Sequence, residues 1–130
     1  MTVEKPSAVV RILVVDDDAA ARRMMRRVLE RSGYAVDEAP DGRSGLDRVH
    51  ATRPDLLLLD LRMPGELSGM EVATLLRDDE TVKGMPIVIV SASAHLDARE
   101  IIAKLGCDAF VEKPVDFDEL RETIARLLPS

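Results

Sequence analysis

Several residue types are scarce in this sequence, and each scarcity excludes a class of protein. A single cysteine cannot form an internal disulfide, and Cys107 and the two histidines lack the spacing of a zinc site. No apolar run approaches the roughly 20 residues of a membrane span, and residues 1–8 lack the apolar centre of a signal peptide. We therefore expect a cytoplasmic protein that makes no contact with a membrane.

Basic charge and aromatic side chains are also in short supply. The formal net charge is −6 at pH 7, and no basic stripe with interleaved aromatic residues occurs, so nucleic acid is not expected as a direct partner. With only 2% aromatic residues, the core must be built from aliphatic side chains. A length of 130 residues suits one domain. We expect a flexible arm at residues 1–8 and a single folded domain over residues 9–130.

Short aliphatic runs that end in polar residues are what the sequence does contain. The central run, Leu56–Leu59, lies between Pro54 and the pair Pro64-Gly65, and its four leucines predict a strand buried on both faces. Asp60 follows it directly. Three further runs have the same form: Ile12–Val15 precedes Asp16–Asp18, Ile87–Val90 precedes Ser91, and Ala109–Glu112 precedes Lys113.

Segments with helical periodicity alternate with these runs. Start signals for helices stand near Ala19, Asp41, Ser68, Asp97 and Asp116. Including a weaker edge strand at Tyr34–Ala39, the order is strand then helix, five times. This order predicts an α/β fold, in which a doubly wound parallel sheet of five strands carries five helices on its two faces. The helical stripes place Met24 and Met25, and likewise Leu75 and Leu76, in the core.

The outer face of the first predicted helix is basic within an acidic protein. It carries Arg22, Arg23, Arg26, Arg27 and Arg31 against one acid, Glu30, which gives a local balance of 5 − 1 = +4. A solvated helix face explains this pattern in ordinary terms. The contrast with the charge of the whole chain also allows the face to be a docking surface. The sequence leaves both interpretations open.

Parallel strands have their C-terminal ends at one edge of the sheet, where open α/β sheets bind ligands. Asp16, Asp17 and Asp60 would then lie close together, and their repulsion favours a bound cation. Oxygen ligands without soft donors favour Mg²⁺, which uses carboxylates together with phosphate oxygens and water. In such a site Lys113 would counter negative charge, Ser91 would donate a hydrogen bond, and Asp60 would be the nucleophile of an aspartyl phosphate.

These motifs together resemble the receiver domain of two-component response regulators, similar to chemotaxis receivers, over nearly the whole chain. The resemblance rests on Ile12–Asp18, Asp60–Gly65, Ser91-Ala92 and Phe110–Pro114. It implies a flavodoxin-like fold with strand order 2-1-3-4-5. It also implies a phosphorelay function: a histidine kinase or histidine phosphotransfer protein donates a phosphoryl group, and residues 96–128 present the altered face to a downstream protein or output domain. Such a domain is not a turnover enzyme, although it promotes its own phosphorylation and slow dephosphorylation.

The resemblance also implies a role for each matching residue. Asp60 corresponds to the phosphoacceptor, Asp17 to a direct Mg²⁺ ligand, and Asp16 to an acid that acts mainly through water. The backbone carbonyl of Arg62 is a further ligand, and its side chain stands where this family tunes dephosphorylation. Ser91 corresponds to the hydroxyl and switch residue, Lys113 to the phosphate-pairing lysine, and Phe110 to the aromatic switch. The resemblance also implies a cis bond before Pro114. The first helix would dock the kinase through its arginines, Arg22, Arg23, Arg26 and Arg27.

Two other interpretations compete with this one. A haloacid dehalogenase-like phosphatase would use Asp16 as its nucleophile, but Ala20 stands where that family has threonine or valine, and the chain has little room for the larger core and cap. A receiver-shaped interaction module that is never phosphorylated is the other alternative, against which the complete set of acids, hydroxyl and lysine argues. The loop Gly65–Gly69 also has one residue more than is usual in the receiver family.

Overall fold

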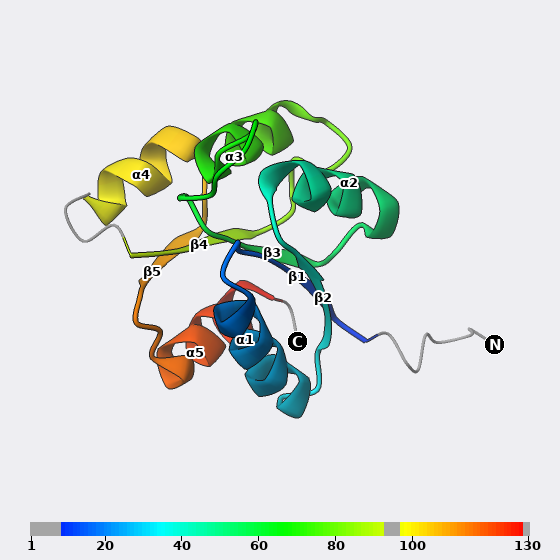
Figure 1. Cartoon of the computed structure of the whole chain (residues 1–130), viewed down its shortest axis with the longest axis vertical. Helices are drawn as coiled ribbons and strands as arrows, with labels where there is room; N and C mark the ends of the chain where they lie inside the picture. Colours follow the sequence, from blue (N-terminus) through cyan, green and yellow to red (C-terminus); the bar gives the residue numbers. More distant parts are fainter. Residues whose placement is uncertain (1–8, 93–96, 129–130) are drawn as a thin grey trace.

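Alternating strands and helices form a three-layer arrangement in the computed structural model, which describes residues 9–92 and 97–128 (Figure 1). The parallel sheet has the order β2-β1-β3-β4-β5, so the prediction of a flavodoxin-like doubly wound sheet is confirmed. The expected arm at residues 1–8, the start of the output face at residue 96 and the final Pro129 lie outside the described residues. The strands are β1 (Arg11–Val15), β2 (Ala35–Ala39), β3 (Leu56–Leu59), β4 (Ile87–Ser91) and β5 (Ala109–Glu112).

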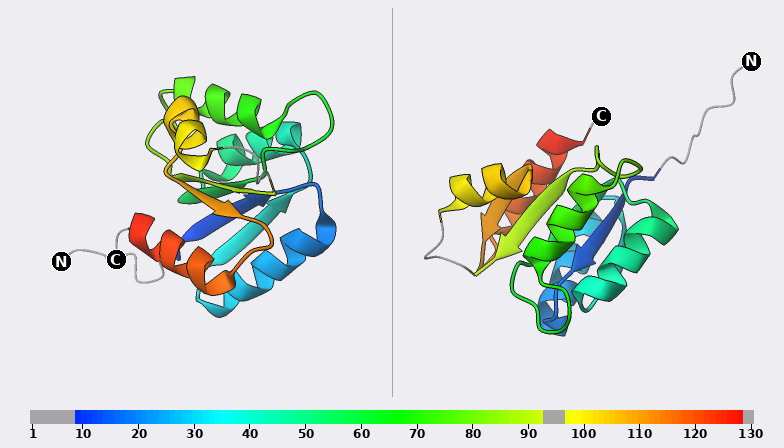
Figure 2. Two further views of the ribbon diagram at one scale, coloured as in Figure 1. Left: turned by 90° about the vertical axis from the view of Figure 1, so that its left-hand side faces the viewer. Right: turned by 90° about the horizontal axis from the view of Figure 1, so that it is seen from above.

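Five helices cover the two faces of this sheet. Figure 2 shows α1 and α5 together on one face, and α2, α3 and α4 on the other. The bounds are α1 (Ala19–Arg31), α2 (Gly42–Thr52), α3 (Gly69–Asp78), α4 (Ala98–Leu105) and α5 (Phe117–Leu127). Among the helices of the described ranges, none has the length and apolar composition needed to cross a bilayer.

The leucine run of β3 divides its side chains between the two cores. Leu57 and Leu59 pack under α2, α3 and α4, whereas Leu56 and Leu58 pack under α1 and α5. All four are at most 1% exposed. A strand with side chains alternating between two covered faces has to be apolar at every position, which explains the unbroken run.

Side-chain caps fix where the helices begin. Ser68 and Glu71 form a capping box at the start of α3, since the Glu71 N–H donates to Ser68 Oγ and the Ser68 N–H donates to Glu71 Oε1. Asp116 caps α5 by accepting from two backbone N–H groups, and Asp97 caps α4 through the N–H of Arg99. Gly106 ends α4 in the left-handed conformation, at φ 70°.

Two predictions about the core are wrong. Met24 is 49% exposed and Leu75 is 45% exposed, although both were expected in apolar stripes. In α1 the buried positions are Met25 and Leu29, which lie one helical turn apart. The buried face is narrow, and Met24 lies about 100° around the helix axis from Met25, so its side chain faces outward. Cys107 is buried as a small core residue, and burial raises the pKa of its thiol to about 11.

Gly69, the first residue of α3, allows this helix to approach the end of β3. Its N–H donates to the carbonyl of Leu61, and a Cβ at this position would lie 2.0 Å from the Asp60 carbonyl oxygen. Only glycine permits that distance, because the atom in the way belongs to the backbone. The glycine therefore determines how closely α3 packs beneath the residue that ends the central strand.

We expect Gly69→Ala to lower the free energy of unfolding by about 1 to 3 kcal/mol, because α3 has to move away from Asp60. Urea denaturation followed by circular dichroism measures the change. Gly84→Ala is the matched control, since a Cβ at Gly84 would meet nothing within 4 Å. Equal stability of the two variants would contradict the close approach described here.

Candidate functional site

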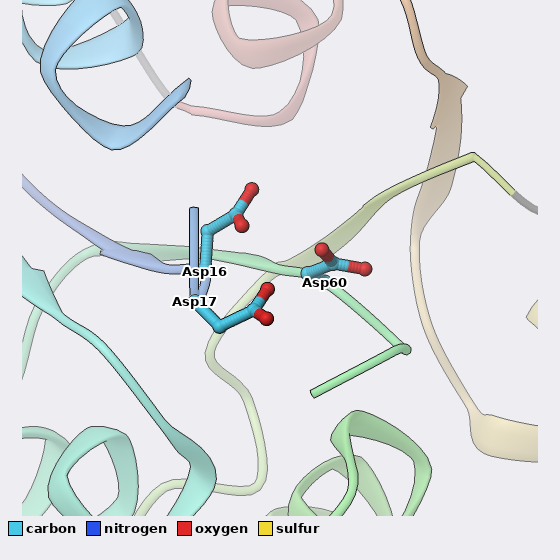
Figure 3. Close-up of side chains that lie close together, drawn as sticks. All are labelled: Asp16, Asp17 and Asp60. Atoms are coloured by element: carbon cyan, nitrogen blue, oxygen red, sulfur yellow. The ribbon is translucent and has the colours of Figure 1, made fainter. Parts of the chain in front are cut away.

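The acidic residues predicted from the sequence meet at the C-terminal edge of the sheet. Val15 of β1 is in register with Leu59 of β3, so the residues that follow them, Asp16 and Asp60, leave neighbouring strands at the same level. One carboxylate oxygen from each of Asp16, Asp17 and Asp60 lies within 4.8 Å of the others. Figure 3 shows the three side chains close together where β1 and β3 end.

Lys113 holds two of these carboxylates together. Its Nζ lies 2.7 Å from Asp16 Oδ2 and 3.1 Å from Asp60 Oδ2. Lys113 follows β5, its own N–H donates to the carbonyl of Ser91, and the bond to Pro114 is cis, as the resemblance implied. The ammonium therefore compensates the repulsion between the buried acids.

Asp60 is buried, with 6% of its surface exposed. Its Oδ1 accepts the backbone N–H of Arg62 at 3.0 Å, while Oδ2 faces Lys113. Burial raises the pKa of Asp60 above the ordinary carboxyl value, although the Arg62 N–H and the charge of Lys113 act in the opposite direction. Burial acts to lower the pKa of Lys113, but the hydrogen bond to Asp16 and the charge of Asp60 outweigh it and raise that pKa.

Asp16 and Asp17 differ in how firmly they are held. The carboxylate of Asp16 is buried and accepts the N–H of Asp18 at 2.9 Å as well as the Lys113 ammonium. The carboxylate of Asp17 is exposed, and no residue of the described ranges donates a hydrogen bond to it. Asp17 thus offers the most accessible oxygen ligands of the cluster.

The donor set fits a hard divalent cation. Its candidate ligands are carboxylate oxygens, and among the described residues no thiol or imidazole belongs to the cluster. Mg²⁺ prefers such oxygen donors and keeps several waters, which suits one exposed and two buried carboxylates. Arg62, whose carbonyl was expected as a further ligand, is exposed, and its N–H is already bonded to Asp60.

The predicted switch residues come from β4, which pairs with β3, and from β5, the edge strand that pairs with β4. Ser91 is the last residue of β4, is fully buried, and is paired in register with Glu112 of β5. Phe110 lies in β5, is half-buried, and packs against the core beneath α2, α3 and α4. Ser91 and Phe110 therefore lie on adjacent, hydrogen-bonded strands of the sheet.

The arginines of α1 do not form one uniform surface. Arg22 and Arg26 both bind Glu38 of β2, at 3.1 and 3.0 Å, whereas Arg23 and Arg27 are exposed. Burial acts to raise the pKa of Glu38, but its hydrogen bonds to Arg26 and Arg22 lower it. Sequence reasoning missed Glu38, because its place in a weak edge strand gave no indication of which helix it would face.

Fold and site define an α/β domain in which three carboxylates and a lysine meet at the C-terminal edge of a parallel sheet. The chain belongs to the response regulator receiver domain family, whose model matches residues 12–125. This is a family of signalling domains rather than a classical enzyme family. Its receiver domains bind Mg²⁺ at the acidic pocket and interact in general with histidine kinases and downstream targets.

Particular relatives agree with this assignment. The polar-differentiation response regulator DivK of Brucella anthropi is 34% identical over 117 residues, which cover 90% of this chain and 94% of DivK. Chemotaxis protein CheY4 of Vibrio cholerae has a TM-score of 0.85 at 28% identity, covering 93% of this chain and 100% of CheY4. The Thermotoga maritima response regulator TrrA, solved in complex with Mg²⁺ and BeF, has a TM-score of 0.82 at 36% identity, covering 92% and 100%.

Replacing Lys113 by methionine removes the cation that compensates Asp16 and Asp60. We expect Lys113→Met to lower the free energy of unfolding in EDTA, because two buried carboxylates lose their partner. We also expect MgCl₂ to stabilise this variant more than the parent, since the competing ammonium is gone. Urea denaturation in EDTA and in excess MgCl₂ measures both effects.

Lys83→Met is the matched control, because Lys83 is exposed and pairs only with exposed Glu80 in the described part of the chain. This variant should respond to MgCl₂ as the parent does. An identical response of the parent and Lys113→Met would show that Lys113 does not compete with the cation.

Proposed function

We propose that this receiver domain accepts a phosphoryl group on Asp60, in the cytoplasm, from the phosphohistidine of a histidine kinase or histidine phosphotransfer protein. The observation that carries the proposal is the convergence of Asp16, Asp17 and Asp60 with Lys113 between two of them. The groups gathered at the three strand ends are carboxylates, and a carboxylate can act as the nucleophile that forms an aspartyl phosphate. Asp60 is best placed, since its Oδ2 lies 3.1 Å from the Lys113 ammonium and its Oδ1 is oriented by the Arg62 N–H.

Each residue of the site has a separate role in phosphoryl transfer. An oxygen of Asp60 attacks the phosphorus atom, the phosphorus–nitrogen bond of the donor breaks, and the imidazole nitrogen keeps the electron pair. Asp16, Asp17, Asp60 and the Arg62 carbonyl would hold Mg²⁺, whose positive charge would orient and neutralise the phosphoryl oxygens. Lys113 then pairs with the transferred group. The same site promotes slow hydrolysis of the aspartyl phosphate, so the domain resets itself.

Asp60→Asn should abolish phosphorylation, because an amide cannot act as the nucleophile. Incubation with acetyl phosphate and MgCl₂, followed by intact mass measurement and mapping of the modified residue, reports the result. Asp18→Asn is the control: Asp18 caps α1 by accepting the N–H groups of Ala20 and Ala21, and asparagine retains that role. Asp18→Asn should therefore add one phosphoryl group, as the parent does.

Two outcomes of this experiment would contradict the proposal. Modification mapped to Asp16 would favour the phosphatase-like alternative, in which Asp16 is the nucleophile. A parent protein that binds Mg²⁺ but gains no phosphoryl group would favour the interaction module that is never phosphorylated.

Phosphorylation adds a charge of about −1.5 to −2 beside Lys113 and near the end of β4. Ser91 and Lys113 each gain a charge-assisted contact with the new group, and an inward movement of Ser91 opens space for Phe110. Driving this change from about 1:99 to 99:1 requires roughly 5.5 kcal/mol, while two such contacts supply about 1.5 to 3 kcal/mol each. Two such contacts total about 3 to 6 kcal/mol, which reaches the requirement only at the upper end of that range. We therefore expect an incomplete shift, with the described part of the 96–128 face (α4, β5 and α5) already active in a fraction of molecules before phosphorylation.

The exposed part of α1 supports docking of the phosphohistidine partner. Arg23 and Arg27 are free of ion pairs within the described residues, and Met24 between them is exposed beside Lys113. A hollow lined by Ala21, Met24, Pro114 and Phe117 joins α1 to the start of α5. An acidic partner with an apolar contact would fit this surface and bring its histidine to the edge that carries Asp60.

Charge reversal at Arg23 and Arg27 together should slow phosphoryl transfer from a cognate phosphohistidine partner, because the encounter loses electrostatic attraction. Phosphorylation by acetyl phosphate should not change, and transfer rates with both donors are compared. Charge reversal at Arg48 and Lys83, which are exposed elsewhere on the surface, is the control with the same change in net charge. Equal loss with both donors would point to damage at the site rather than to docking.

A further inference from the structure

Asp17 is the acid of the cluster whose carboxylate no described residue holds by a hydrogen bond. Its position is therefore determined by its backbone, and above all by the peptide group that joins it to Asp16. The carbonyl oxygen of that peptide group accepts a hydrogen bond from Arg22 Nη1 at 2.6 Å. Asp16 itself is fixed independently, by its side-chain bonds to the Asp18 N–H and to Lys113.

Arg22 is in turn held in one orientation. Its Nε donates to Glu38 Oε1 at 3.1 Å, and its side chain is only 16% exposed. The guanidinium is a planar fork, so one nitrogen can bind the carboxylate of β2 while another binds the carbonyl at the end of β1. Arg22 thus connects α1, β1 and β2 at the point where the acidic cluster begins.

We infer that Arg22 is a positioning residue for the metal site, which acts through the Asp16 carbonyl to fix the direction of Asp17. This inference rests on the proposed function, because it concerns the same Mg²⁺ site. Glu38 contributes by orienting Arg22 and by balancing its charge. Arg22 therefore belongs to the site and not to the docking surface, which leaves Arg23 and Arg27 as the exposed cations of α1.

The direction in which Mg²⁺ affinity changes when Arg22 is removed distinguishes a positioning role from a purely electrostatic one. A positive charge near a cation site repels the cation, so removing Arg22 should strengthen Mg²⁺ binding if charge alone mattered. Loss of positioning has the opposite effect, because outer groups that orient metal ligands typically contribute about 10- to 100-fold to metal affinity. Weaker binding after removal of a cation is thus a result that charge alone does not produce.

Titration of the ¹⁵N-labelled domain with MgCl₂, followed by the amide shifts of the acidic cluster, tests the inference. We expect Arg22→Met to weaken Mg²⁺ binding about 10-fold or more. Arg26→Met is the matched control: Arg26 binds the same Glu38 and carries the same charge, but it makes no contact with Asp16. This control should bind Mg²⁺ as tightly as the parent, or slightly more tightly.

Arg22→Lys keeps the charge, and it replaces Arg22→Met as the test variant if the amide spectrum shows that Arg22→Met does not fold. Lysine cannot hold the carbonyl and Glu38 with a fixed fork, so its Mg²⁺ binding should also weaken. Parent-like or tighter binding by a folded Arg22 variant would overturn the inference alone. A parent protein that binds no Mg²⁺ would overturn the proposed function, and the inference with it.

Discussion

Repulsion between three carboxylates at one edge of the sheet is the constraint on which the rest of the structure depends. Two like charges about 5 Å apart repel by about 3 to 4 kcal/mol at an effective dielectric constant near 20. The protein tolerates this through the Lys113 ammonium, which lies within 3.1 Å of both Asp16 and Asp60. In the account proposed here, a divalent cation would take over the compensation of Asp16 and Asp60, and the Lys113 ammonium would then pair with a phosphoryl group.

The apolar core supplies the stability that this arrangement uses. Fully burying a leucine contributes about 1.5 to 3 kcal/mol, so the four leucines of β3 alone contribute roughly 6 to 12 kcal/mol as an upper estimate. That is more than the repulsion within any one pair of these carboxylates. In the observed register Val15 of β1 pairs with Leu59 of β3, and this pairing places Asp60 beside Asp16.

Periodicity and strand ends sufficed to predict a parallel sheet and the convergence of Asp16, Asp17, Asp60 and Lys113, because both follow from local pattern and parallel topology. The strand order came from the resemblance to the receiver family. Contacts between distant surface groups carry no such pattern. The pairing of Arg22 and Arg26 with Glu38 depends on how α1 lies on β2, and the exposure of Met24 depends on the width of the buried face. The sequence shows a glycine at position 69, but it does not show that this residue packs against the backbone carbonyl of Asp60.

The central claim is that Asp60, with Lys113 and Ser91 around it, receives a phosphoryl group at a Mg²⁺ site. A crystal structure of this domain with Mg²⁺ and beryllofluoride, a phosphoryl mimic, tests it most directly. The account predicts beryllium bound to a carboxylate oxygen of Asp60, fluoride atoms within hydrogen-bond distance of Lys113 Nζ and Ser91 Oγ, and Lys113 released from Asp16. Beryllofluoride on Asp16, or a Lys113 that still bridges Asp16 and Asp60 with the mimic bound, would contradict it.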